Sequence, residues 1–125
     1  MFKINADKSI HITRGDIASI EITAKLPSAE NYIFQPGDVV QFKVFEKKRC
    51  DNVFLVKPVR VMEETEVVTI NLDKTDTKLG ESIDKPFDYW YEVELNPDTV
   101  PQTIIGYDDD GAKIFRLYPE GGDLQ

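Results

Sequence analysis

Apolar and polar residues alternate along much of the chain, and this pattern predicts strands with one buried face. The clearest case is 87–95, where one parity holds Phe87, Tyr89, Tyr91, Val93 and Leu95. The other parity holds Asp88, Trp90, Glu92, Glu94 and Asn96. A period of two is expected of a half-buried strand. We therefore expect a strand here, with the first set facing the core.

The same alternation, with β-branched residues, runs through 17–26. In 39–46 one face carries Val40, Phe42 and Val44, and the other face adds Val39 and Phe45, so we expect both sides to be partly covered. Further strands are predicted at 10–13, 53–62, 66–72, 103–107 and 112–118. Pro58 cannot donate to a ladder, which places its strand at an edge or at a bulge.

One segment, 73–80, lacks the alternation of the strands. Residues 73–80 read Asp-Lys-Thr-Asp-Thr-Lys-Leu-Gly, where Asp or Thr can cap a first helical turn and Gly80 can close it. We expect one short helical turn there. The chain is thus all-β, with seven to eight short strands separated by turns. This spacing favours an antiparallel β-sandwich or a small barrel, and strand number alone does not separate the two.

Length and composition fit a single domain. A chain of 125 residues with 41% hydrophobic content can bury a core without a disulfide or a metal, so no cofactor is predicted. We expect a flexible N-terminal segment at 1–9, one β-sandwich domain at 10–119 and a frayed tail at 120–125. The single cysteine, Cys50, lies in a polar run with no evident partner base and is interpreted as incidental.

The charge balance narrows the class of partner. The chain has 15 Lys and Arg and 23 Asp and Glu, which gives a net charge of −8. This negative charge disfavours binding to phosphate backbones and to anionic lipid surfaces. We expect no nucleic-acid partner and no membrane association. No apolar run approaches the roughly 18 residues of a membrane span, and the N-terminus shows no apolar signal region. We expect a soluble protein made in a cytoplasm.

No arrangement of residues points to catalysis. His11 is the only histidine, so neither a His-based metal site nor a paired His dyad is available, and we expect it to face solvent. Nucleophile-elbow, P-loop and dinucleotide patterns are absent. Glu92 and Glu94 would lie about 7 Å apart on one strand face. This spacing fits the paired carboxylates of a hydrolase, which stays an alternative, but the solvent-exposed face of an ordinary strand has the same pattern. We predict that the protein is not an enzyme.

Two candidate binding features remain. Asp108 and Asp110, before Gly111, offer hard oxygen ligands to calcium. No bidentate Glu follows at the EF-hand offset, so a polar hairpin tip is the favoured interpretation and no metal site is predicted. Trp90 would point outward beside Glu92, as a protein contact or a sugar-stacking platform. Two alternatives stay open: the loop at 27–36 covers it, or a bulge inverts the parity of the strand. Tyr107 joins Trp90 as a candidate binding residue.

Four segments together resemble a known family. They are Arg14-Gly15-Asp16 with the strand that follows, 36–44 (PGDVVQFKV), 89–95 (YWYEVEL) and 103–107 (TIIGY). Over about residues 10–120 the chain resembles small proteins encoded in prophages of Gram-positive bacteria. It is also similar to the N-terminal immunoglobulin-like domain of the siphophage upper baseplate protein family.

The resemblance implies an immunoglobulin-like sandwich that works by assembly in a phage tail or baseplate, without catalytic residues. Its partners would be other tail or baseplate proteins, or further copies of itself. It would be found in the bacterial host cytoplasm during expression, and also in the virion tail if it is a virion component and not an assembly factor. The alternative is a carbohydrate-binding β-sandwich module that uses exposed aromatics such as Trp90, Tyr107 or Tyr118.

Overall fold

The computed structural model describes residues 2–4, 8–26, 28, 30–46, 49–78, 83–106 and 111–120, with only the backbone described at 2–4 and 49–52. These residues form nine strands and no helix. The strands are β1 (Phe2–Ile4), β2 (Ile10–Thr13), β3 (Ala18–Ile22), β4 (Val39–Glu46), β5 (Arg49–Arg60), β6 (Val68–Leu72), β7 (Phe87–Leu95), β8 (Gln102–Ile105) and β9 (Lys113–Tyr118).

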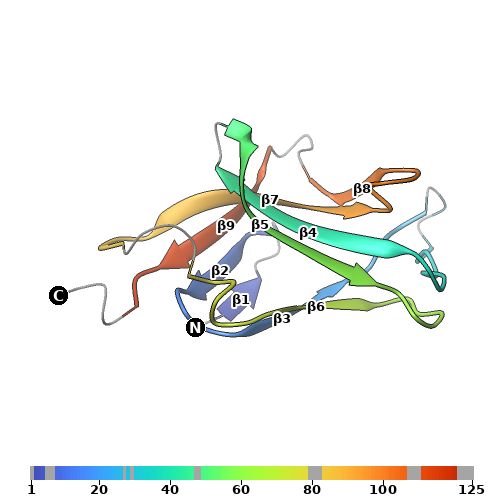
Figure 1. Cartoon of the computed structure of the whole chain (residues 1–125), viewed down its shortest axis with the longest axis horizontal. Coiled ribbons are helices and arrows are strands. Elements are labelled where there is room, and N and C mark those ends of the chain that lie inside the picture. Colours follow the sequence, from blue (N-terminus) through green and yellow to red (C-terminus); the bar gives the residue numbers. More distant parts are fainter. Residues whose placement is uncertain are drawn as a thin grey trace.

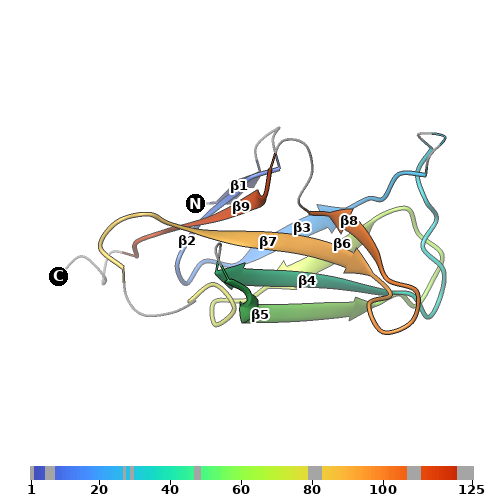
Figure 2. The same ribbon diagram turned by 90° about the horizontal axis from the view of Figure 1, so that it is seen from above.

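The strands form two sheets that lie face to face (Figures 1 and 2). The larger sheet has the order β1-β2-β9-β7-β4-β5, with β8 added beside β7, and the smaller sheet pairs β3 with β6. The protein is therefore all-β, and its two layers are consistent with the expected β-sandwich. One pair departs from the antiparallel expectation, because β2 and β9 run parallel. A tight hairpin cannot join parallel strands, and here the rest of the chain lies between β2 and β9.

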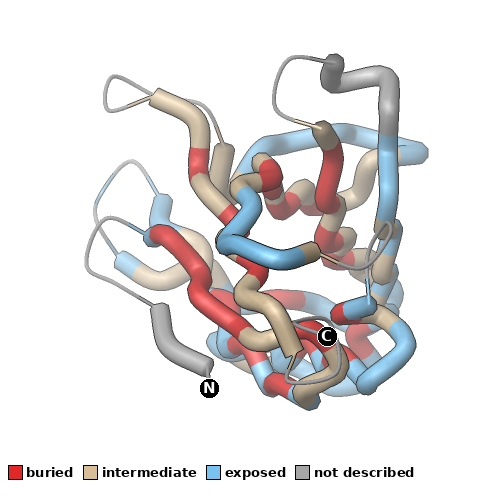
Figure 3. Tube along the Cα trace, turned by 90° about the vertical axis from the view of Figure 1, so that its left-hand side faces the viewer, coloured by how far each residue is buried: buried red, intermediate tan, exposed pale blue. Residues whose placement is uncertain are grey.

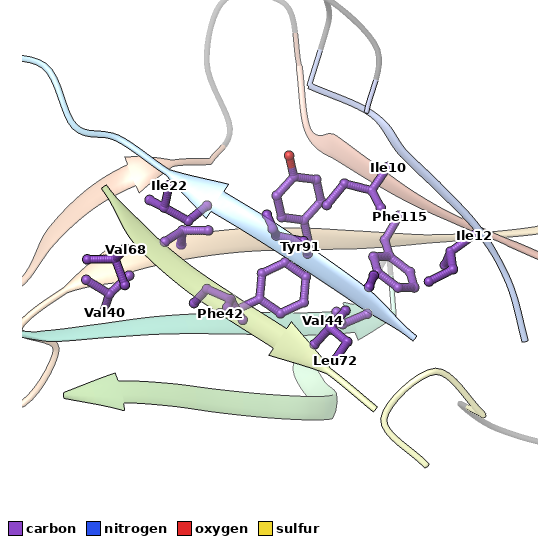
Figure 4. Close-up of a cluster of buried hydrophobic side chains, with 14 of the residues drawn as sticks. Ile10, Ile12, Ile22, Val40, Phe42, Val44, Val68, Leu72, Tyr91 and Phe115 are labelled. Carbon is purple, nitrogen blue, oxygen red and sulfur yellow. The ribbon is translucent and has the colours of Figure 1, made fainter. Parts of the chain in front are cut away.

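The core follows the predicted alternation. Burial alternates along the strands (Figure 3), and in β7 the side chains of Tyr89, Tyr91, Val93 and Leu95 are buried as expected. Phe87, at the start of β7, is 43% exposed. The side chains that meet between the sheets (Figure 4) include Ile22, Val68 and Leu72 from the smaller sheet, and Val40, Phe42, Val44, Tyr91 and Phe115 from the larger.

Strand β5 ends the larger sheet, which confirms the edge position predicted from Pro58. Pro58 lies opposite Gln41 in a regular part of the ladder. The register of β4 and β5 shifts instead between Val44 and Phe45, so the bulge lies closer to the hairpin end of the strand.

The helical turn expected near 73–80 is not a helix in the described residues. The Asp73 carboxylate accepts hydrogen bonds from the backbone N–H groups of Thr75 and Asp76, both at 2.9 Å, as the N-cap of a helix would. The Thr77 N–H donates to the Asp73 carbonyl at 3.3 Å, so the segment makes one α-type turn that does not continue into a helix. The hydroxyl of Thr77, which is fully buried, donates to the Asp16 carbonyl at 2.7 Å. This bond ties the turn to the β2–β3 connection. Gly80 lies outside the described residues.

The ends of the chain also differ from expectation. Residues 2–4, assigned above to a flexible segment, form strand β1, because their backbone pairs antiparallel with residues 10–12 of β2. At the other end, Glu120 forms an ion pair with Lys78 at 3.4 Å. Residues 121–125 lie outside the described part. In that part, no helix is long and apolar enough to cross a membrane.

Candidate interaction face

A row of apolar side chains crosses the outer face of the larger sheet. In the ladder, Val53 of β5 lies opposite Phe45 of β4, Phe45 opposite Trp90 of β7, and Trp90 opposite Ile114 of β9. Directly opposed residues share a face. Their sequence neighbours Val44, Tyr91 and Phe115 are buried on the inner face, so these four residues point away from the core. We call Val53, Phe45, Trp90 and Ile114 the apolar row.

Trp90 lies in the middle of this row. Its ring packs edge-on against Phe45, with ring centroids 6.4 Å apart and an interplanar angle of 76°. Phe45 is only 5% exposed, whereas Trp90 and Ile114 are half-buried and Val53 is 40% exposed. The outward direction of Trp90 follows the predicted parity of β7. Its indole is thus held in place by a neighbour and still partly open to solvent.

On one side the apolar row is bordered by Lys43, Glu92 and Glu94. Lys43 lies opposite Glu92 and forms an ion pair with Glu94 (Nζ to Oε1, 3.4 Å). Burial raises the pKa of Glu92, and a hydrogen bond with Glu94 and the charge of that carboxyl raise it further, while Lys43 acts in the opposite direction. Two carboxyl groups therefore share one lysine here.

On the other side, Asp88 and Arg116 lie opposite each other and form a bidentate ion pair. Arg116 Nε donates to Asp88 Oδ1 at 2.6 Å and Nη2 donates to Oδ2 at 3.0 Å. Hydrogen bonding to Asp88 and the charge of its carboxylate raise the pKa of Arg116. Planar pairing of this kind fixes both side chains. The apolar row is thus framed by charged residues on two sides.

His11 is buried, so the expectation that it faces solvent is wrong. It lies beside Arg116 on β2 and is 7% exposed. Its Nε2 is 3.1 Å from the Ser9 hydroxyl, its Nδ1 is 3.0 Å from the Tyr118 hydroxyl, and its ring stacks on Tyr118. Ser9 and His11 have the spacing of a nucleophile and its base, but both are buried. We assign them a structural role between β2 and β9.

The other predicted site residues fall in different places. Tyr107, Asp108 and Asp110 lie outside the described residues, so the calcium and aromatic predictions made on them stay predictions. Tyr118 is half-buried against His11. In the part of the chain that is described, no three His, Cys, Asp or Glu residues are grouped to hold a metal ion.

Sequence reasoning found Trp90 but not the row around it. Phe45 carried a signal, since it is an apolar residue on the second face of 39–46. Ile114 and Val53 gave no such signal in the sequence, because each is a single apolar residue on the outward face of its own strand. Only the strand register shows that Val53 lies opposite Phe45 and that Ile114 lies opposite Trp90.

No protein-family model, curated protein or solved structure matches this chain. Its function must therefore be inferred from the geometry of its own residues and from the sequence resemblance.

Proposed function

We propose that this protein is a non-enzymatic structural or assembly protein of a phage or prophage, a component of a tail or baseplate that acts through protein–protein contacts. The observation that carries the proposal is the apolar row, Val53-Phe45-Trp90-Ile114, across the outer face of the larger sheet. The solvent side of an antiparallel sheet normally carries polar residues. Here four adjacent strands each contribute an apolar one.

The composition of this face is typical of an interface. Apolar and aromatic residues lie at the centre, and charged residues form the border: Lys43, Glu92 and Glu94 on one side, Asp88 and Arg116 on the other. Interfaces have this organisation, and tryptophan is enriched among residues that dominate their binding energy. A partner that covers Trp90 would remove water from the row, while the border would set its orientation.

The immunoglobulin-like topology and the tail or baseplate setting rest on the sequence resemblance over residues 10–120. The all-β fold with two layers agrees with the first of these at the level of architecture. The tail or baseplate setting determines which partners to test: phage tail and baseplate proteins, or further copies of this chain.

The test is co-expression with the tail and baseplate proteins of a phage or prophage that encodes this chain, followed by co-purification. The wild-type chain should retain a partner, and Trp90→Ala should weaken retention at least tenfold. Phe87→Ala is the matched control, because Phe87 is an exposed aromatic of the same strand that lies off the row. Thermal melts must show that both variants fold. Equal retention by the wild type and Trp90→Ala would contradict the proposed role of this face.

A carbohydrate-binding module is the second candidate. The observation in its favour is that half-buried Trp90 is flanked along β7 by the outward carboxylates of Asp88 and Glu92, which can accept hydrogen bonds from sugar hydroxyls. Glycan binding that is abolished by Trp90→Ala in a folded variant would favour it. Absence of binding across a broad glycan array, with partner retention intact, would exclude it.

A further inference from the structure

The free edge of β5 is a second surface, which adjoins the apolar row at Val53. At 12 residues β5 is the longest strand, and among the described strands it pairs only with β4. Its other edge lies open at the front of Figure 1 and at the lower border of Figure 2. An unpaired edge presents backbone donors and acceptors that can template another strand.

Exposed apolar side chains gather at this edge. Val53 and Phe54 are each 40% exposed and Val56 is 48% exposed, all within four positions of β5. Phe54 and exposed Phe87 both pack against Tyr89, with ring centroids 5.2 and 4.9 Å apart. An exposed apolar edge is normally blunted by charges, but the stretch 53–56 contains no charged residue.

We infer that a second copy of this chain pairs with β5 across a two-fold axis, antiparallel, with Val53 of one copy opposite Val56 of the other. The register of β4 and β5 selects this alignment. Val53 lies opposite Phe45 and Leu55 opposite Val44, so Phe54 is the extra residue of a bulge. Val56 lies opposite Lys43. Both valines are therefore on the outer face.

Opposed residues of two strands must share a face, and a two-fold axis makes the contact self-complementary. When Val53 pairs with Val56 of the second copy, the opposed residues share the outer face and the contact is the same in both directions. The two exposed valines of each copy, four in all, then lie together on the outer face of the joined sheet. Phe54 then lies opposite Leu55 of the other copy. Beyond this core, Pro58 cannot donate a hydrogen bond, so the pairing is short.

The paired part of β5 carries no negative charge, although the protein as a whole is acidic. Two chains of net charge −8 repel each other, but residues 53–60 contain no carboxylate. The charged residue nearest the pairing, Lys57, is neutralised within its own copy by Asp76 at 2.7 Å. Neither a carboxylate nor an unpaired lysine is brought against its counterpart at the core of the contact.

The exposed apolar area at the β5 edge limits the affinity of the dimer. Three side chains about two-fifths exposed offer on the order of 200 Å² per copy, given about 150–250 Å² for a whole aromatic side chain. Stable interfaces bury about 800 Å² per partner. The dimer should therefore be weak, with a Kd on the order of 0.1–1 mM. It would form mainly where copies are held close together, since tethering raises the effective concentration to the millimolar range.

Sedimentation velocity of the full chain from about 10 μM to 1 mM tests the contact. The mean mass should rise toward that of a dimer, and the rise should be larger at high salt because screening reduces the net repulsion. Val56→Lys should remain monomeric. Val100→Lys is the matched control, since Val100 is 69% exposed and lies on the β7–β8 connection. A wild-type monomer at 1 mM, or association of Val56→Lys equal to wild type, would overturn the inference.

Disulfide trapping tests the register. In a Cys50→Ser background, which removes the only native cysteine, Val53→Cys is mixed with Val56→Cys under mild oxidation. Directly opposed Cα atoms lie about 4.5–5.5 Å apart, within disulfide range, so the mixture should crosslink and neither variant alone should do so. Crosslinking of Val53→Cys to itself would refute this register. The inference is independent of the proposed function, because Trp90→Ala should leave both results unchanged.

Discussion

Asp38 shows how one carboxylate fixes the entry to a central strand. It accepts hydrogen bonds from the Tyr32 hydroxyl at 2.8 Å, the Gln35 backbone N–H at 2.9 Å and the Asn96 side-chain amide at 3.1 Å. Burial acts to raise the pKa of Asp38, but these hydrogen bonds together outweigh it, so the pKa is lowered. The Asn96 side-chain oxygen accepts from the Val39 N–H at 2.8 Å. The group thus joins the start of β4 to the end of β7.

The pH dependence of Asp38→Asn follows from this. A lowered pKa in the folded state means that the ionised carboxylate stabilises the fold above the unfolded pKa of about 3.9, and that this contribution is lost as the pH falls through the folded value. Asp38→Asn should lower the free energy of unfolding by about 1 kcal/mol at pH 7. The difference should shrink below about pH 4. Urea unfolding at pH 7 and pH 3 would measure it, and an equal loss at both pH values would contradict the assignment.

Glu92 should behave in the opposite way. Because burial and the Glu94 carboxyl raise its pKa, its contribution to stability is fully present below the unfolded pKa of about 4.3 and is lost as the pH rises through the folded value. Glu92→Gln should therefore stabilise the protein at pH 7, by about 0.5 kcal/mol, and the gain should vanish below about pH 4. Glu21→Gln, at an exposed position of β3, is the control. A Glu92→Gln variant less stable than wild type at pH 7 would rule this out.

At the scale of elements, strand positions were predictable and the way strands meet was not. Each of the eight predicted runs contains a strand, because the period of two depends only on local alternation. Register and neighbours depend on contacts distant in sequence. The parallel pairing of β2 with β9, the burial of His11 against Tyr118 and the apolar row all arise from such contacts. Strand β1 has only three residues and showed no alternation to detect.

The segment after β6, expected to be one short helical turn, is a single turn that does not continue as a helix, and capping residues suit both structures. Asp73 does cap backbone N–H groups, as predicted, but Thr77 turns inward to the Asp16 carbonyl. The Asp73 cap could be predicted from the local sequence. The Asp16 carbonyl that accepts from Thr77 could not, because it is distant in sequence. The turn is thus held by local hydrogen bonds and by one tertiary hydrogen bond.

Replacing this hydrogen bond provides a test. Thr77→Val keeps the shape of the buried side chain but removes the donor to the part-buried Asp16 carbonyl, so the free energy of unfolding should fall by about 1 kcal/mol. Thr69→Val, at an exposed position of β6, should stay within about 0.5 kcal/mol of wild type. Chemical denaturation of the two variants side by side would decide it. Equal stability of the two variants would show that the turn does not depend on this contact.

At the scale of the whole molecule, we propose different tasks for two surfaces that adjoin at Val53: a partner protein binds the outer face around Trp90, and a second copy binds the β5 edge. Chains bound through the outer face would be held near one another, and the higher effective concentration would favour the weak edge contact. The two contacts are separable, since Trp90→Ala affects one and Val56→Lys the other.

The central claim is that the outer face of the larger sheet is where a partner binds, and Trp90 is the only tryptophan in the chain. Its fluorescence therefore reports on that face alone. The decisive measurement is the emission of Trp90 during titration with a tail or baseplate partner that lacks tryptophan, with complex formation followed in parallel by light scattering. We predict a shift to shorter wavelength that saturates with the complex, as water leaves the indole. A complex that forms while the emission stays unchanged would contradict the account.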